Sequence, residues 1–274
     1  MMFLRSDRQL WSGIVFAFGV IALLMGEAVR AQAGSAADSE RVDAILTRLE
    51  RRNEGLRDIR CDVRLSEEDQ VNLSKRTKTG NAVLRFGDPN PMFLIHFDRT
   101  ETDGVLGKQE WYLFDGRWLM EGSERLQQVT QTEFAQPGEK VDFFDLETAP
   151  FPMPFGQKKE TILRNFEVAL AAASPSDPPE TDHLVCTPKA DSRFRAKYDR
   201  MEFFVRRGLD LPTRISITRN KGLETTVADF PGLDTSSINA GVKDDAFAQP
   251  AAWKKFKFVV EGAGPSVERK PENP

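Results

Sequence analysis

Few side chains in this sequence are suited to acid–base or nucleophilic chemistry. It contains two histidines, His96 and His183, and two cysteines, Cys61 and Cys186. Two cysteines are too few for a four-cysteine zinc site, and neither a Gly-x-Ser-x-Gly turn nor a His-Glu-x-x-His motif occurs. A Cys61–His96 or Cys186–His183 pair is chemically conceivable, but no local motif supports one. We therefore predict no catalytic residue, no metal site and no cofactor.

The charged residues exclude one class of partner and leave another open. The chain has 38 basic and 42 acidic residues and a net charge of −4, which argues against a nucleic-acid binder. The acidic runs 67–69 and 244–245 lack the spaced ligands and the glycine of a calcium loop. A basic run has two interpretations, a solvated face, which we favour, or a contact with an acidic head group or partner: Arg193, Arg195, Lys197 and Arg200.

The aromatic composition is uneven, with 20 Phe against 2 Tyr and 4 Trp. Phenylalanine supplies an apolar ring with no polar atom to satisfy. Two hypotheses remain open: the rings fill an ordinary core, or they line a lumen that helices cover without filling, where Phe and Met would adapt to acyl chains.

The first 31 residues have the pattern of a secretory signal peptide. Arg5 and Arg8 precede the uncharged run 9–26, and small residues allow cleavage after Ala31 or Ala33. The alternative, an uncleaved anchor, would need an apolar stretch of roughly 20 residues, and this one is shorter. We expect export to the bacterial periplasm, where Cys61 and Cys186 either form a disulfide or remain buried thiols.

The periodicity of the remaining chain predicts one helix followed by many strands. A helix with Ser39 as its N-cap and Gly55 at its end would bury a stripe of Val42, Ile45, Leu46 and Leu49. Alternation of apolar and polar residues then predicts antiparallel strands at 59–66, 81–86, 92–97, 110–114, 118–121, 126–130, 183–187, 201–206, 213–218 and 224–230. Between the two groups lie a proline-rich stretch, 150–156, and a predicted helix, 161–173. We expect a single domain at 38–260 and a disordered tail at 261–274.

The order of these elements resembles the LolA family of periplasmic outer-membrane lipoprotein carriers, which includes lipoprotein-sorting proteins. The resemblance runs from about Val42 to Phe247. It is carried by several motifs in order, among them Gly-Asn-Ala-Val-Leu-Arg-Phe at 80–86 before Pro91, Phe-Asp-Gly-Arg-Trp-Leu-Met at 114–120, and Leu-Val-Cys-Thr-Pro-Lys at 184–189. The segments 56–63, 201–205 with 211–215, and 239–247 also match the family's pattern. The motifs are individually common, and their order and spacing carry the likeness.

The resemblance implies a mainly β fold with helices (α+β), namely an unclosed antiparallel β-barrel of about 10–11 strands with an N-terminal helix and a helical lid insert. Its concave side would hold lipid acyl chains. The candidate cavity wall is Phe93, Ile95, Phe97, Trp111, Trp118, Phe203 and Ile215, and the candidate lid is Phe151, Met153, Phe155, Ile162 and Phe166.

By resemblance, the expected function is a non-enzymatic periplasmic carrier or binder of lipids or lipoprotein acyl chains, delivering cargo towards the outer membrane. Its partners would be an inner-membrane donor and an outer-membrane acceptor. The alternative is an envelope sensor that binds a protein partner without transport. In one departure from the best-known carriers, Asp88 and Asn90 precede the prolines where a basic residue tied to lid opening is expected, so that role is lost or moved to Arg85.

Overall fold

The N-terminal helix forms as its apolar stripe predicts. The computed structural model describes residues 36–87, 90–136, 138–140 and 155–261, which lie within one compact unit, Gly34–Pro274. Helix α1 (Ala36–Glu54) buries Val42, Ile45, Leu46 and Leu49. The predicted signal peptide and residues 262–274 of the predicted tail lie outside the described residues. No helix in the described ranges combines the length and the apolar character needed to cross a membrane.

All strands of the described residues belong to one sheet of 13 strands. Its order is β13-β7-β6-β5-β3-β2-β1-β12-β11-β10-β9-β8, with β4 paired to β3. The strands are β1 (Asp58–Asp69), β2 (Ser74–Arg85), β3 (Met92–Thr102), β4 (Val105–Leu106), β5 (Glu110–Phe114), β6 (Trp118–Ser123), β7 (Gln128–Glu133), β8 (Phe166–Leu170), β9 (Thr181–Pro188), β10 (Arg200–Arg206), β11 (Leu211–Arg219), β12 (Glu224–Asp229) and β13 (Lys257–Glu261).

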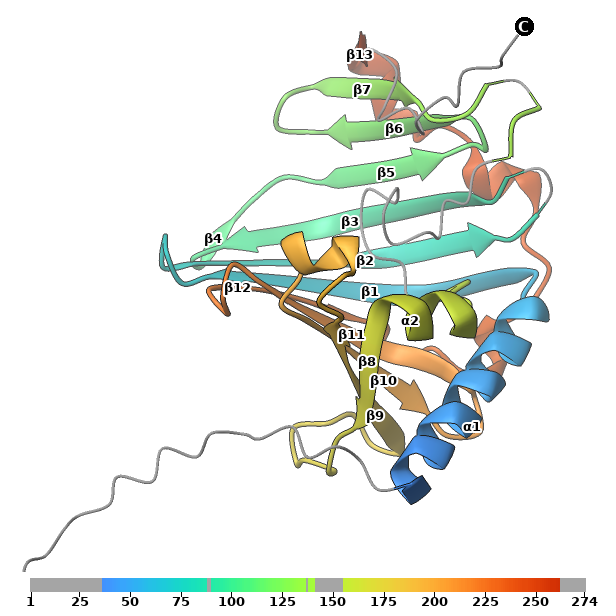
Figure 1. Ribbon diagram of the computed structural model, residues 1–274. Coiled ribbons are helices and arrows are strands. Elements are labelled where there is room, and N and C mark those ends of the chain that lie inside the picture. Colours follow the sequence, from blue (N-terminus) through green and yellow to red (C-terminus); the bar gives the residue numbers. More distant parts are fainter. Residues whose placement is uncertain (1–35, 88–89, 137, 141–154, 262–274) are drawn as a thin grey trace, which may run out of the picture. The chain divides into compact units, whose positions relative to one another are not determined.

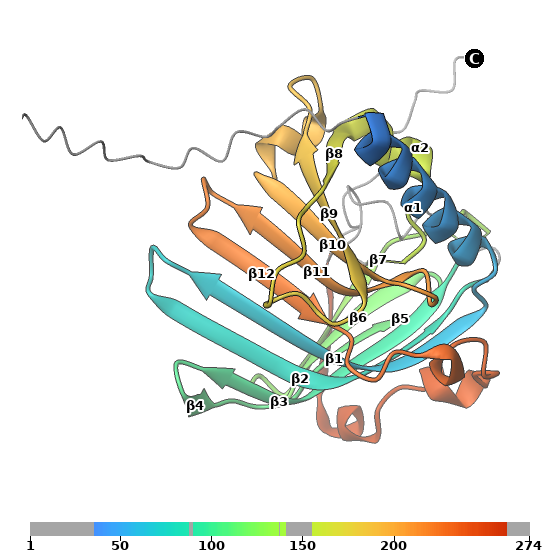
Figure 2. The same ribbon diagram turned by 90° about the horizontal axis from the view of Figure 1, so that it is seen from below.

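The sheet is antiparallel except at one edge, where β13 runs parallel to β7. The end strands β13 and β8 have no strand pairing with each other in the described residues, so the barrel does not close. Figures 1 and 2 show the sheet curling, with α1 and α2 (Lys159–Asn165) on its inner side. The predicted fold, a mainly β, unclosed antiparallel barrel with an N-terminal helix, is confirmed, with 13 strands rather than 10 or 11.

The predicted helix 161–173 is wrong beyond its first turns. Helix α2 ends at Asn165, and the chain continues as strand β8. Phe166, Val168 and Leu170 alternate with exposed residues and pair with β9. The apolar residues of this stretch fit a helical period and a period of two equally well, and pairing with β9 decides between them.

The two faces of the sheet carry separate apolar clusters. We call the face that carries Phe93, Ile95 and Phe97 the inner face, and the face that carries Leu94 the outer face. Because successive side chains of a strand point to opposite faces, the inner face forms one continuous cluster with α1 and α2. This inner cluster extends from Leu119 on β6 to Phe166 on β8.

The outer face is covered by the C-terminal segment. Phe247 and Trp253, in the 3₁₀ turns Asp244–Phe247 and Ala251–Lys255, pack on Trp111, Leu113 and Met120. The side chain of Trp253 is 1% exposed and lies directly over Gly122 of β6, where an added Cβ would sit 2.4 Å from the indole Nε1.

Arg85 fastens the same segment to the outer face. Its guanidinium pairs with Asp244 and lies 5.0 Å from the ring centroid of Phe247. The resemblance suggested that the lid-opening role could have moved to Arg85. These contacts place Arg85 on the face opposite Phe155, Ile162 and Phe166, the three candidate lid residues that the structure describes.

The two cysteines are buried free thiols on the inner face. Cys61 lies on β1 and Cys186 on β9, and strands β12, β11 and β10 separate them. Burial raises the pKa of each thiol to about 12. Both groups are therefore neutral and weakly nucleophilic near neutral pH.

Substituting Gly122 with alanine is expected to lower the free energy of unfolding by about 1–3 kcal/mol, because the new methyl group would overpack against Trp253. The control is Gly55→Ala, whose Cβ would meet nothing closer than 3.6 Å. Urea denaturation measures the free energy of unfolding of both variants. Equal midpoints for the two variants would show that the C-terminal segment is not packed on β6 in this way.

The thiols should be unreactive in the folded protein. At about pH 8, a chromogenic disulfide reagent is expected to label neither cysteine of the native chain and both after unfolding in guanidinium, because only the unfolded chain exposes ionisable thiols. Rapid labelling of the native protein, or no free thiol after unfolding without reductant, would contradict the assignment.

Candidate functional site

Five of the seven predicted wall residues lie together on the inner face. Phe93, Ile95, Phe97, Phe203 and Ile215 are at most 6% exposed and belong to the inner cluster. The pairing of the strands brings these side chains to one face of the sheet. Phe203 lies opposite Ile215 in the β10–β11 ladder, and Ile95 lies opposite Ala82 in the β2–β3 ladder. Their role as the wall of a lipid-binding cavity stays a prediction.

Trp111 and Trp118 lie on the outer face instead. Tyr112 is paired with Ile95 and therefore shares its face, whereas Trp111 is paired with the outer-face residue His96. Trp118 likewise packs against the outer cluster. Residues 110–114 are apolar on both faces of β5, so their alternation did not reveal which set points inwards.

The predicted lid residues are only partly described. Phe155, Ile162 and Phe166 belong to the inner cluster, whereas Phe151 and Met153 lie outside the described residues. The Phe155 ring lies 5.2 Å from that of Phe230. Phe166 belongs to β8 and stacks on Phe194, also at 5.2 Å. Of the three, only Ile162 lies on a helix.

Polar contacts fasten the start of α2 to α1. The backbone N–H of Lys159 donates to Glu50 Oε1 at 3.1 Å, and its Nζ lies 2.6 Å from Asp43 Oδ1. Asn53 Nδ2 donates to the carbonyl of Gln157 at 3.2 Å. These contacts hold the two helices together on the inner side of the sheet.

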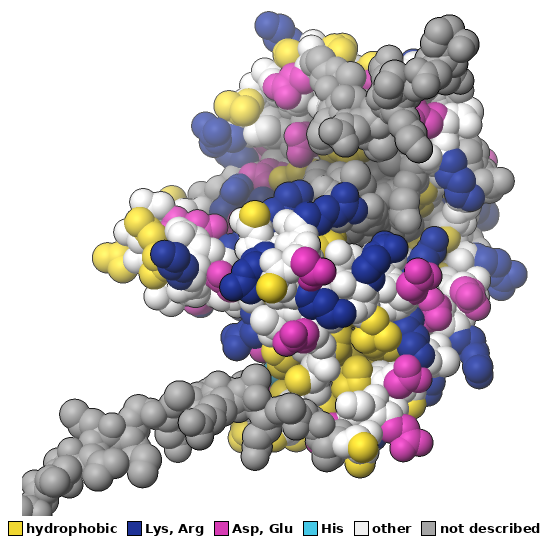
Figure 3. All heavy atoms as spheres, viewed as in Figure 1, with side chains coloured by type: hydrophobic (Ala, Val, Ile, Leu, Met, Phe, Trp, Pro, Cys, Tyr) yellow, Lys and Arg dark blue, Asp and Glu magenta, His cyan; other side chains and the backbone are white. Residues whose placement is uncertain are grey.

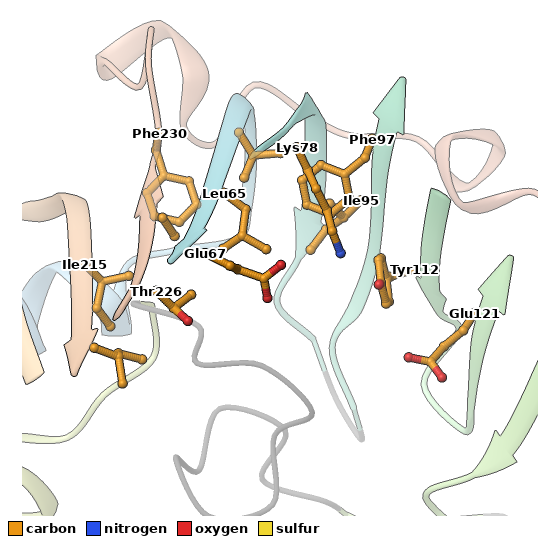
Figure 4. Close-up of a pocket in the computed structure, with 13 residues that line it drawn as sticks. Leu65, Glu67, Lys78, Ile95, Phe97, Tyr112, Glu121, Ile215, Thr226 and Phe230 are labelled. Atoms are coloured by element: carbon orange, nitrogen blue, oxygen red, sulfur yellow. The ribbon is translucent and has the colours of Figure 1, made fainter. Parts of the chain in front are cut away.

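A cavity of about 250 Å³ opens on the inner face. Figure 4 shows side chains from β1, β2, β3, β5, β6, β11 and β12 pointing into it. Most of its wall is aliphatic or aromatic, and the lining among the described residues is Val63, Leu65, Glu67, Lys78, Ile95, Phe97, Tyr112, Glu121, Ile215, Ile217, Thr226, Ala228 and Phe230. Ile95, Phe97 and Ile215 were predicted from the sequence, and the others were not.

One buried cation lies in the cavity wall. Lys78 is 5% exposed, and its Nζ lies 2.9 Å from Glu110 Oε2. The ammonium group also lies 5.5 Å from the ring centroid of Phe97 and 5.7 Å from that of Tyr112, within reach of a cation–π interaction. Arg76 contacts the same Glu110 carboxylate. Lys78 is therefore held by a carboxylate and two rings.

Lys78 was not among the predicted wall residues, because the strand predicted from the sequence starts at residue 81, whereas β2 starts at Ser74 in the structure. Alternation along β2 places Lys78 on the same face as Ala82 and Leu84. The β2–β3 ladder shifts register between Thr79 and Gly80. At Gly80 an added Cβ would lie 1.8 Å from the carbonyl oxygen of His96, so the close approach of the two strands requires glycine there.

Two ionisable groups of the wall have raised pKa values. Burial, followed by the charge of Glu261, raises the pKa of Glu121. Burial and the neighbouring Glu110 raise the pKa of Tyr112 well above its ordinary range. The tyrosine hydroxyl therefore remains protonated, and the wall offers a neutral hydrogen-bonding group beside the Lys78–Glu110 pair.

Both histidines lie away from the cavity. His96 stacks on Trp111 with ring centroids 5.0 Å apart, on the outer face. His183 stacks on Phe204 at 4.1 Å, with its Nε2 3.3 Å from Glu202. Each ring is held by an aromatic neighbour, and neither lies next to a cysteine in its ladder. In the described part of the chain, no group of three or more His, Cys, Asp or Glu side chains is arranged to hold a metal ion.

No protein-family model and no curated protein matches this chain. Solved structures do match it. LprF from Mycobacterium bovis is similar at 10% identity and a TM-score of 0.43, with 78% of this chain and 98% of that one covered. A LolA superfamily protein from Nitrosomonas europaea is similar at 13% identity and a TM-score of 0.35, over 76% and 97%.

A third match is MucB in the MucA/MucB complex of Pseudomonas aeruginosa, at 16% identity and a TM-score of 0.42. The match covers 77% of this chain and 62% of that one. The matched structures thus include the LolA superfamily that the sequence resembles. At these identities and TM-scores they do not bear on what the chain binds.

Proposed function

We propose that this protein is a non-enzymatic carrier or binder of lipids or lipoprotein acyl chains in the periplasm, delivering its cargo towards the outer membrane. The observation that supports it best is the cavity of about 250 Å³ on the inner face, whose wall is mainly aliphatic and aromatic. Such a wall binds by excluding water from apolar surface, and each buried methylene contributes about 0.8 kcal/mol.

The distribution of reactive groups also supports a binder. The cavity wall contains no histidine or cysteine among the described residues, and its charged groups are partly neutralised within the wall. The Lys78–Glu110 pair and the Tyr112 hydroxyl would contact the polar end of a cargo molecule, while Ile215, Ile217 and Phe230 would contact its chain.

Ala228→Phe is expected to weaken binding of a fluorescent fatty acid by at least about tenfold, or about 1.4 kcal/mol. Ala228 lines the cavity, so a phenyl ring there would occupy the space of the acyl chain. The control is Val227→Phe, which introduces the same ring at the preceding residue of β12, whose side chain points to the outer face. Fluorescence titration measures both affinities.

Thermal melts of both variants establish that each is folded at the titration temperature. If the folded Ala228→Phe and Val227→Phe variants bind the fatty acid with equal affinity, the cavity is not its binding site. No binding of the fatty acid by the wild-type protein would contradict the proposed function itself.

Protein purified without detergent is expected to carry lipid, which native mass spectrometry would detect as a mass added to the chain. A carrier should also move a labelled lipid from donor to acceptor vesicles at a rate that rises with protein concentration. If the purified protein carries no lipid, transfers none between vesicles and instead binds one envelope protein stably, the sensor alternative would be supported.

A further inference from the structure

Exposed aliphatic side chains gather at one end of the sheet. Five of the eight large hydrophobic side chains that are exposed in the described residues lie on three hairpin ends: Val71 (60% exposed), Leu73 (87%), Val105 (69%), Leu106 (65%) and Leu223 (38%). They follow β1, β3 and β11, and we call these five residues the tip rim. Isolated exposed aliphatic side chains are ordinary, but five at neighbouring hairpin ends form a patch, which marks an interaction surface.

Hydrogen bonds hold the three hairpin ends side by side. The backbone N–H of Gln70 donates to the carbonyl of Leu223 at 2.9 Å, which joins the β1–β2 end to the β11–β12 end. The N–H of Asp103 donates to the carbonyl of Lys75 at 2.9 Å, which joins the β3–β4 end to the same hairpin. The tip rim is therefore one continuous edge of the fold.

The basic run of the sequence lies next to this rim. Arg193, Arg195, Lys197 and Arg200 are all exposed, and the first three belong to or follow the 3₁₀ turn Arg193–Ala196. Asp199 ties that loop to the β11–β12 end, because its Oδ2 accepts from the Gly222 N–H at 3.0 Å. Figure 3 shows hydrophobic side chains at the protruding end of the hairpins, with Lys and Arg side chains behind them.

The rim also adjoins the cavity. Glu67 and Thr226 line the cavity and lie opposite each other in the β1–β12 ladder. Two residues further along the same ladder, Asp69 lies opposite Glu224, and the hairpin ends begin. The tip rim therefore stands about two residues, roughly 7 Å, beyond the cavity wall.

We propose that the tip rim and its basic neighbours dock on the surface of an anionic lipid bilayer. The aliphatic side chains lie at the ends of hairpins and line no cavity that the structure shows, so they suit shallow insertion between head groups better than a partner helix or strand. The cations beside them complement a negatively charged membrane surface. This inference goes beyond the proposed function, since docking does not require that the cavity hold a lipid.

Co-sedimentation with vesicles tests the docking. The protein used is purified from cells that express the full sequence. The wild-type protein is expected to bind phosphatidylcholine vesicles containing about 30% phosphatidylglycerol and to bind pure phosphatidylcholine far more weakly. Binding should also fall between about 0.1 M and about 1 M salt, where the Debye length drops from about 10 Å to about 3 Å.

Two double variants separate the apolar and the electrostatic contributions. Leu73→Ser with Leu106→Ser is expected to reduce the vesicle partition coefficient at least about tenfold, because exposed leucine would no longer insert. Arg195→Gln with Lys197→Gln should reduce it by about 25-fold, or about fivefold per cation. The matched control is Val260→Ser, which removes a 64% exposed aliphatic side chain from β13, away from the rim.

All variants should keep the wild-type melting temperature and fatty-acid affinity, which separates failure of docking from failure of the proposed function. Vesicle binding that is unchanged in both double variants would overturn the proposal, as would equal loss in Val260→Ser. A chain that binds no vesicles, but whose rim variants lose capture of one envelope protein, would assign the rim to a protein partner and also overturn it.

Discussion

The structure depends on the side-chain alternation of a long antiparallel sheet, held in register from β3 through β12 to β10. In that register Leu65 faces Ala228, and Ala228 faces Ile215, so three neighbouring strands present apolar side chains on the same side. A slip of one residue in any ladder would turn its apolar set towards the opposite face. The cavity, the packing of α1 and the covered outer face all follow from this one constraint.

Because the sheet does not close into a barrel, its inner face is not filled by its own side chains alone. A closed barrel of small diameter fills its interior with its own side chains, whereas an open sheet must cover its inner face with other elements. Here α1 and α2 cover the part of the sheet near β8 and β11, and the C-terminal segment is used on the opposite face, over Trp111 and Met120. The inner face between β11 and β6 thereby retains a cavity.

The sequence predicted those elements in which one periodicity dominated. The stripe of α1 and the alternation in β1, β3 and β11 were unambiguous, and each forms as expected. The prediction did not succeed where two patterns coincided. Phe166–Leu170 satisfies both a helical and a strand period, and β5 is apolar on both faces, which reversed the expected direction of Trp111.

Other features depend on tertiary contacts that no local pattern records. Lys78 belongs to a strand because β2 pairs with β1 and β3 well before the predicted start at residue 81, and alternation along β2 then places Lys78 on the face of Ala82. Likewise, β13 is a strand because it pairs with β7. The excess of Phe over Tyr now has a location. Phe93, Phe97, Phe203 and Phe230 lie on the inner face, whereas Phe247 and Phe256 belong to the C-terminal segment that packs on the outer face, so the composition reflects two apolar layers rather than one.

The central claim is that the inner face, and not the outer one, receives an acyl chain. Intermolecular NOEs between a fatty acid and the methyl-labelled protein test this, because an NOE arises only between protons in near contact. We expect NOEs to the methyl groups of Val63, Ile95 and Ile215, which line the cavity, and none to those of Leu94, Leu113 and Val129 on the outer face. NOEs to the outer set, or to neither set at saturating ligand, would contradict it.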